Sequence, residues 1–200
     1  IFQALHAGNP SEVRSVYLTA SGGPFWTWKP EAMDDITLED TLRHPTWQMG
    51  PKVTIDSATM MNKAMEIVEA RWLFGLRPQQ IQVVIHPESI IHSFVEFCDG
   101  AMIAQLGTPD MRTPIQYALT YPSRCECPSP RLDLYEAGQL NLHRPEIDRF
   151  PALRLGHEVA ERGGTAGAVL NGANETAVGL FRKGMMHYRE IARSTERALR

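Results

Sequence analysis

Three polar side chains around residue 63 suit a phosphorylated, metal-assisted ligand. On a 3.6-residue helical period, Asn62, Lys63 and Glu66 share an arc of about 100°. The ammonium group can neutralise a phosphate, the amide can donate a hydrogen bond to it, and the carboxylate can ligate a hard divalent cation. A solvated helix face with a Lys63–Glu66 ion pair explains the same spacing. One carboxylate does not complete a Mg²⁺ or Mn²⁺ site, so further oxygen ligands must come from elsewhere.

The residues just before this run predict an anion site. We expect a helix over residues 58–74, with Asp56 or Ser57 as its N-terminal cap. Its packed face is expected to comprise Met61, Met65, Val68 and Trp72. Ser57 would then lie where free N–H groups and the helix dipole favour a phosphate.

Two loops add candidate residues. Ser21 and the two glycines after it follow a strand predicted over residues 13–19, and such a loop lets backbone N–H groups and a hydroxyl approach an anion. An ordinary glycine turn is the alternative. The segment 44–50 carries Trp47 between a proline and a glycine, and it can form a lid that excludes water. Core anchoring by Trp47 is the other interpretation.

Two further pairs of residues carry weaker signals. His86 and His92 are six positions apart and can serve as ligands or acid–base groups, although hydrogen-bonded structural histidines are commoner. Cys125 and Cys127 lack the spacing of a zinc finger.

Strand and helix patterns alternate early in the chain, whereas its end is helical throughout. Strands are predicted at residues 13–19, 52–55, 81–86, 92–97 and 101–106, and helices at 111–121, 153–161, 166–182 and 188–199. These patterns predict an α/β (α+β) domain over residues 1–130, with a small mixed sheet and flanking helices. After this domain we expect a linker over residues 131–149 and then the start of an all-helical domain over residues 150–200.

Composition excludes several classes of protein. The 200 residues are 43% hydrophobic and 22% charged, as in ordinary soluble globular proteins, and their formal net charge is -3. This charge argues against a nucleic acid or an anionic membrane surface as the partner. No apolar run approaches the ~20 residues of a membrane-spanning helix. Three cysteines favour a reducing compartment over a disulfide framework.

Eight motifs, in order along nearly the whole chain, resemble the 1-deoxy-D-xylulose 5-phosphate reductoisomerase family. They occupy residues 21–25, 44–50, 56–63, 69–74, 86–93, 104–107, 109–114 and 170–175. The run Asp-Ser-Ala-Thr-Met-Met-Asn-Lys at residues 56–63 is highly specific.

The resemblance implies an NADPH-dependent enzyme that requires Mg²⁺ or Mn²⁺. Its reaction is the isomerisation and reduction of 1-deoxy-D-xylulose 5-phosphate to 2-C-methyl-D-erythritol 4-phosphate, in non-mevalonate isoprenoid synthesis. The family has an N-terminal NADPH-binding domain, whose glycine-rich loop is absent from this sequence, and the family's Asp-Ser-Glu run, which supplies the other two metal ligands, is absent as well. Both ends of the chain look cut, so we expect part of a longer protein, inactive alone.

The resemblance also implies a role for each site residue. The substrate phosphate would be bound by Ser21, Ser57, Asn62 and Lys63. His44 would contact the substrate, Trp47 would close over it as part of the flap, and Gly50 would lie against the nicotinamide cofactor. Glu66 would contact the substrate as one of three carboxylate ligands to the metal, which makes Trp47, His44 and Glu66 the catalytic set. A homodimer in the bacterial cytoplasm or the plastid stroma is implied as well.

Two alternatives remain open. A non-catalytic phosphosugar-binding module can share this scaffold, although the joint presence of phosphate, flap and metal residues argues against it. The other alternative is a metal-dependent phosphosugar isomerase or aldolase that never uses nicotinamide. A strand, glycine-rich turn and helix upstream of the chain would exclude it.

Overall fold

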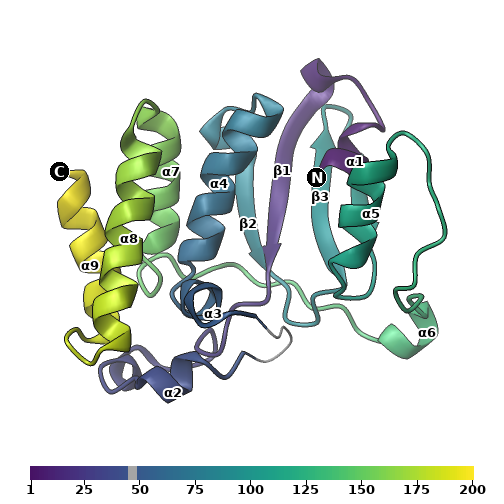
Figure 1. Cartoon of the computed structure of the whole chain (residues 1–200). Coiled ribbons are helices and arrows are strands. Elements are labelled where there is room, and N and C mark those ends of the chain that lie inside the picture. The colour runs from purple at the N-terminus through teal and green to yellow at the C-terminus, as the bar shows by residue number, and fades with distance from the viewer. Residues whose placement is uncertain (45–48) are drawn as a thin grey trace.

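Four strands form one mixed sheet at the centre of the computed structural model, which describes residues 1–44 and 49–200 (Figure 1). They are β1 (Val13–Ala20), β2 (Ile81–Ile85), β3 (Ile91–Phe97) and β4 (Met102–Leu106), in the spatial order β2-β1-β3-β4. β1 pairs in parallel with β2 and antiparallel with β3, and β3 pairs antiparallel with β4. The predicted small mixed sheet with flanking helices is confirmed.

Helices cover the sheet and form the C-terminal end of the chain. The α-helices are α1 (Phe2–Leu5), α2 (Leu38–Thr41), α3 (Pro51–Ala58), α4 (Met61–Phe74), α5 (Arg112–Thr120), α6 (Leu134–Ala137), α7 (Ala152–Arg162), α8 (Ala166–Arg182) and α9 (Tyr188–Leu199). Short 3₁₀ turns occur at η1 (Pro10–Glu12), η2 (Pro30–Met33) and η3 (Pro78–Gln80). None of the helices in the described ranges is long and apolar enough to cross a membrane.

The strand predicted over residues 52–55 is wrong, because these residues belong to α3. Pro51 occupies the first turn of α3, where its fixed φ favours a helix and its missing N–H costs nothing. Thr54, Ile55 and Ala58 then fall on one buried face. A four-residue run rich in β-branched residues is too short for periodicity to separate the two structures.

The helix predicted over residues 58–74 is two helices. α3 ends at Ala58, Met60 adopts a left-handed conformation with φ of 61°, and α4 begins at Met61. Ser57 therefore lies in the last turn of α3 and is not the N-terminal cap of the following helix. The free N–H groups that were expected to attract an anion to Ser57 are not at this residue.

The packed face of α4 also differs from the predicted stripe, since Trp72 is 63% exposed. α4 lies between the sheet and α7 (Figure 1) and is packed on both sides. Ile67 joins a buried cluster with strand residues, whereas Met61 and Ala64 join a cluster with α7 and α8. A single stripe describes a helix with one packed side, and this helix has two.

The last three helices share their core with the first part of the chain. Phe25 and Ile55 lie in one buried cluster with Leu153, Val178 and Ile191. The helices themselves begin where the sequence predicts them. The boundary between residues 130 and 150 stays a prediction.

Substituting Gly156 in α7 tests how closely α4 and α7 pack. A Cβ there would lie 2.7 Å from the Ala64 Cα and 2.8 Å from its carbonyl oxygen, both backbone atoms. We expect Gly156→Ala to lower the free energy of unfolding by about 1–3 kcal/mol in urea denaturation. Gly172→Ala in α8 is the control, since nothing lies within 4 Å of its Cβ position, and it should raise stability by about 0.5 kcal/mol. Equal effects of the two substitutions would contradict this packing.

Candidate functional site

A cavity of about 890 Å³ opens between α4, α5 and the sheet. It is lined by six of the predicted site residues, namely Ser21, His44, Ser57, Asn62, Lys63 and Glu66. Its size is that of a small-molecule site. Of the two other predicted residues, Gly50 is the exposed N-cap of α3 and is not among the lining residues, and Trp47 lies outside the described residues.

Two serines and one histidine meet at one end of this cavity. The Nε2 atom of His44 lies 3.1 Å from the hydroxyl oxygen of Ser21 and 3.1 Å from that of Ser57. Burial lowers the pKa of His44, so the neutral imidazole is favoured near neutral pH. The cluster thus presents polar groups that can hydrogen-bond an anion, from the loop after β1 and from the end of α3.

The glycine after this loop brings the two serines together. Gly23 has a φ of +65°, and a Cβ on it would come 2.8 Å from the Ser57 carbonyl oxygen. Only a residue without a side chain allows this approach at this backbone conformation. The Ser-Gly-Gly sequence is therefore more than an ordinary turn, because it places Ser21 beside α3.

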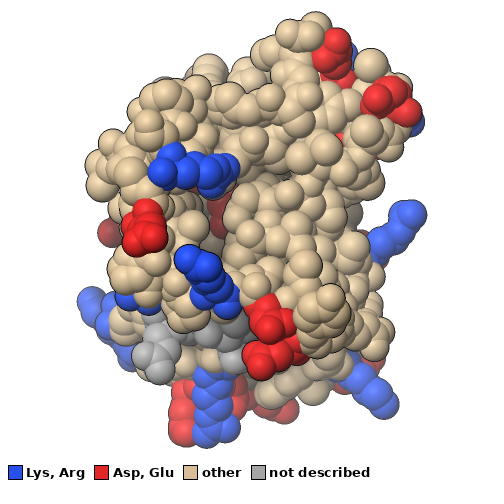
Figure 2. Space-filling view, turned by 90° about the vertical axis from the view of Figure 1, so that its right-hand side faces the viewer, with Lys and Arg blue, Asp and Glu red and all other residues tan. Residues whose placement is uncertain are grey.

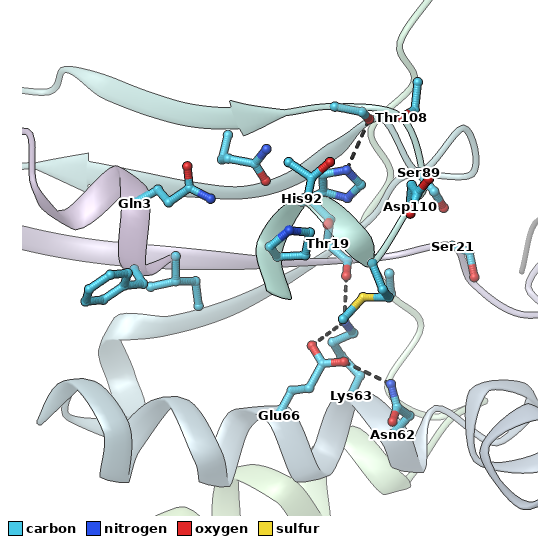
Figure 3. Close-up of a pocket in the computed structure, with 18 of the residues that line it drawn as sticks. Gln3, Thr19, Ser21, Asn62, Lys63, Glu66, Ser89, His92, Thr108 and Asp110 are labelled. Atoms are coloured by element: carbon cyan, nitrogen blue, oxygen red, sulfur yellow. Dashed lines mark hydrogen bonds and ion pairs between the residues drawn. The ribbon is translucent and has the colours of Figure 1, made fainter. Parts of the chain in front are cut away.

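A second polar cluster lies on α4 and lines the same cavity (Figure 3). The Lys63 Nζ donates to the Thr19 carbonyl oxygen at 2.6 Å and to Glu66 at 2.5 Å, and the Asn62 amide donates to Glu66 at 2.9 Å. The predicted Lys63–Glu66 pair is present. It is not a solvated face, since the Lys63 side chain is only 11% exposed.

Glu66 fits the part of one metal ligand in a larger set. Its carboxylate faces the cavity (Figure 3), and carboxylate oxygens are the ligands that hard divalent cations prefer. Within residues 1–44 and 49–200, no three or more His, Cys, Asp or Glu side chains come together to hold a metal. The described residues thus provide Glu66 but no cluster of three such side chains around it.

The two histidines of the 86–92 segment have different positions. His86 is fully buried, with Nδ1 2.8 Å from the Asn141 carbonyl oxygen and with Nε2 accepting from the Ile90 N–H at 3.1 Å. It is a structural histidine. His92 lines the cavity, its Nε2 lies 3.1 Å from the Gly107 carbonyl oxygen, and burial lowers its pKa.

Ser89 and Asp110 also line the cavity, although they are not among the predicted site residues. Ser89 is buried and has a φ of 53°, which is uncommon for a residue other than glycine. Asp110 accepts two hydrogen bonds from Arg112 Nε at 3.0 Å each, and these hold the pKa of its carboxyl well below the usual range. Both lie in motifs that resemble the family, and this resemblance is the sequence signal that could have identified them.

Fold and cavity together define an α/β domain for a small-molecule ligand, extended by C-terminal helices. Residues 1–74 match the profile of the 1-deoxy-D-xylulose 5-phosphate reductoisomerase C-terminal domain, and residues 106–200 match that of the DXP reductoisomerase C-terminal domain. The reductoisomerase of Rhodopirellula baltica is 57% identical over 187 residues, which are 94% of this chain and 41% of the relative. That of Bradyrhizobium diazoefficiens is 50% identical over 199 residues, covering 100% of this chain and 49% of the relative.

Solved structures agree with these matches. The reductoisomerase of Zymomonas mobilis in complex with NADPH has a TM-score of 0.93 and 43% identity, over all of this chain and 51% of its own. A DOX-P reductoisomerase in complex with NADPH, fosmidomycin and magnesium has a TM-score of 0.91 and 44% identity, over 98% of this chain and 48% of its own. The chain belongs to the 1-deoxy-D-xylulose 5-phosphate reductoisomerase family, and it spans about half the length of these relatives.

The lowered pKa of His44 predicts a pH-dependent stability. The imidazole is harder to protonate in the folded chain than in the unfolded chain, where its pKa is about 6.5. Its contribution is therefore present above about pH 6.5 and is lost as the pH falls through the lower folded pKa. In urea unfolding from pH 8 to about pH 5, we expect a steeper loss of stability for the wild type than for His44→Gln. Parallel profiles would show that this ring is not the group responsible.

Proposed function

We propose that the protein carrying this chain converts 1-deoxy-D-xylulose 5-phosphate to 2-C-methyl-D-erythritol 4-phosphate, using NADPH and Mg²⁺ or Mn²⁺. The observation that carries the proposal is one cavity with an anion site, formed by Ser21, His44 and Ser57, and a separate Lys63–Glu66 pair. Relatives that are 50% and 57% identical over nearly the whole chain are named 1-deoxy-D-xylulose 5-phosphate reductoisomerase. A structure of one neighbour contains NADPH, fosmidomycin and magnesium.

The substrate phosphate would bind at the serine end of the cavity. The hydroxyls of Ser21 and Ser57 can each turn from His44 to donate to a phosphate oxygen. A neutral His44 ring can hold a hydroxyl in place or donate a hydrogen bond itself. Asn62 and Lys63 add an amide and a positive charge on the α4 side. Binding energy from this non-reacting phosphate would orient the rest of the substrate.

Glu66, one helical turn beyond Asn62 on α4, would serve the reacting end of the substrate. Glu66 is the residue of this chain that would hold the divalent cation, and Lys63 balances its charge while bonded to the end of β1. When bound, the cation supplies Lewis-acid stabilisation and NADPH supplies hydride. A Cβ on Gly50 would meet nothing within 4 Å, so the space beside this residue would be open to the nicotinamide. The role of Trp47 in the flap is proposed from its motif alone.

A non-catalytic phosphosugar-binding module is the second candidate, because no three or more His, Cys, Asp or Glu side chains among the described residues come together to hold a metal. The homodimer also remains a proposal. Two apolar side chains of α5, Ile115 and Leu119, are more than half exposed, on a face with few charged side chains (Figure 2). This surface supports association of two copies. A location in the bacterial cytoplasm or the plastid stroma stays a prediction.

Consumption of NADPH tests the proposed function. We expect the protein expressed from the complete reading frame to oxidise NADPH when 1-deoxy-D-xylulose 5-phosphate and Mg²⁺ are present, and the 200-residue chain not to do so. The absorbance of NADPH follows the reaction. No consumption by either protein would favour the binding module. Turnover by the 200-residue chain would show that our account of the missing ligands is wrong.

Replacing Glu66 tests the proposed metal ligand. Glu66→Gln keeps the shape of the side chain and removes the charge that attracts a cation, so the Mg²⁺ concentration for half-maximal turnover should rise by at least about tenfold. The control is Glu158→Gln on α7, which removes a carboxylate paired with Arg154 and outside the cavity. It should leave the Mg²⁺ requirement unchanged. An unchanged requirement in Glu66→Gln as well would remove Glu66 from the ligand set.

A further inference from the structure

Both neighbours of Ser57 in the chain are held by the C-terminal helices. Asn174 on α8 donates from its amide nitrogen to the Asp56 carboxylate at 2.8 Å. Tyr188, the first residue of α9, donates from its hydroxyl to the Ala58 carbonyl oxygen at 2.6 Å. These donors lie 118 and 130 positions along the chain from their acceptors.

The Tyr188 hydroxyl satisfies a group that the end of a helix leaves open. Ala58 is the last residue of α3, and the carbonyls of a final helical turn lack partners within their helix. Tyr188 is 5% exposed, and burial raises the pKa of its hydroxyl, which therefore remains a donor at ordinary pH. The bond fixes the backbone one residue after Ser57.

The Asn174 amide acts on the other neighbour in a fully buried position. Asn174 is 0% exposed and Asp56 is 3% exposed. An ionised carboxylate only accepts hydrogen bonds, so the amide nitrogen must face it. The Asn174 Oδ1 then finds no partner among the described residues, which costs stability. The arrangement is explained if holding Asp56, which also pairs with Lys52 at 2.5 Å, offsets that cost.

Tyr188 also contacts the loop that carries Ser21. Its ring packs edge-on against Phe25, with ring centroids 5.3 Å apart, and Phe25 follows Gly23 by two residues. The backbone of Ser57 and Ala58 is thus in contact with Gly23 and bonded to Tyr188. One side chain restrains both segments that supply the serine hydroxyls.

We propose that Tyr188 and Asn174 are positioning residues of the phosphate site: they hold the end of α3 so that the Ser57 hydroxyl stays beside Ser21 and His44. The proposal rests on the proposed function, since it assigns a phosphate group to this cluster. Neither residue lines the cavity, so each acts through Ser57.

The test measures inorganic phosphate binding by titration calorimetry, on the protein expressed from the complete reading frame. Tyr188→Phe keeps the ring and removes the hydroxyl, and we expect phosphate to bind about three- to tenfold more weakly, with a similar rise in the substrate KM. In a Ser57→Ala background the same substitution should add no further loss. Asn174→Ala removes the hydrogen bond to Asp56, the other neighbour of Ser57, and phosphate affinity is measured again. This variant replaces Tyr188→Phe in the test if Tyr188→Phe does not fold.

Thr195→Val is the matched control on α9. It removes another buried hydroxyl, whose bond is to the Ile191 carbonyl of its own helix at 2.8 Å, and it should leave phosphate affinity unchanged. Wild-type affinity in Tyr188→Phe, or a loss as large in the Ser57→Ala background as without it, would overturn the positioning role. Phosphate binding without NADPH turnover by the wild type would overturn the proposed function alone. Absence of phosphate binding by a wild type that consumes NADPH would overturn the positioning role alone, and absence of both would overturn both proposals.

Discussion

The candidate site depends on the contact between the backbone of Gly23 and the last turn of α3. Gly23 combines a left-handed φ with a carbonyl oxygen so near that no side chain fits between the segments. This contact brings a loop from the end of β1 against α3, a helix that begins at Pro51, 28 residues after Gly23 in the chain. Without it, Ser21 and Ser57 would not share the His44 ring, and the cavity would have no polar end on this side.

The second constraint is the packing of α4 on both of its sides. Because α4 lies between the sheet and α7, its small residue Ala64 meets Gly156, and the helices approach closely enough to fix its rotation. That rotation turns Lys63 toward the end of β1, where its ammonium group donates hydrogen bonds to the Thr19 carbonyl oxygen and to the Glu66 carboxylate. A nearly buried ammonium group requires such partners, since desolvation without them would cost several kcal/mol.

Much of the fold follows from local patterns, whereas the contacts within the site do not. The alternation in β3 and the amphipathic pattern of α8 are set by residues near one another in sequence, and both were predicted. Residues 52–55 were not, because a four-residue run rich in β-branched side chains is too short for its pattern to separate a strand from a helix. The bonds from Asn174 and Tyr188 to α3 span more than 100 positions, and no periodicity encodes which helix will meet which. The resemblance to the family predicted Ser21, Ser57 and Glu66 as site residues without indicating how they are held.

Charge is distributed unevenly between the two ends of the cavity, and this has a physical reason. At the serine end, the hydroxyls and the His44 ring, whose pKa is lowered by burial, can meet an anion without an existing ion pair having to break. At the α4 end, Glu66 has a compensating ammonium group on one oxygen and an amide on the other. A carboxylate that would join a cation site needs such partners while no cation is bound, because an unpaired charge in a partly buried wall is costly. The Lys63–Glu66 pair therefore holds in place the carboxylate that we propose as a metal ligand.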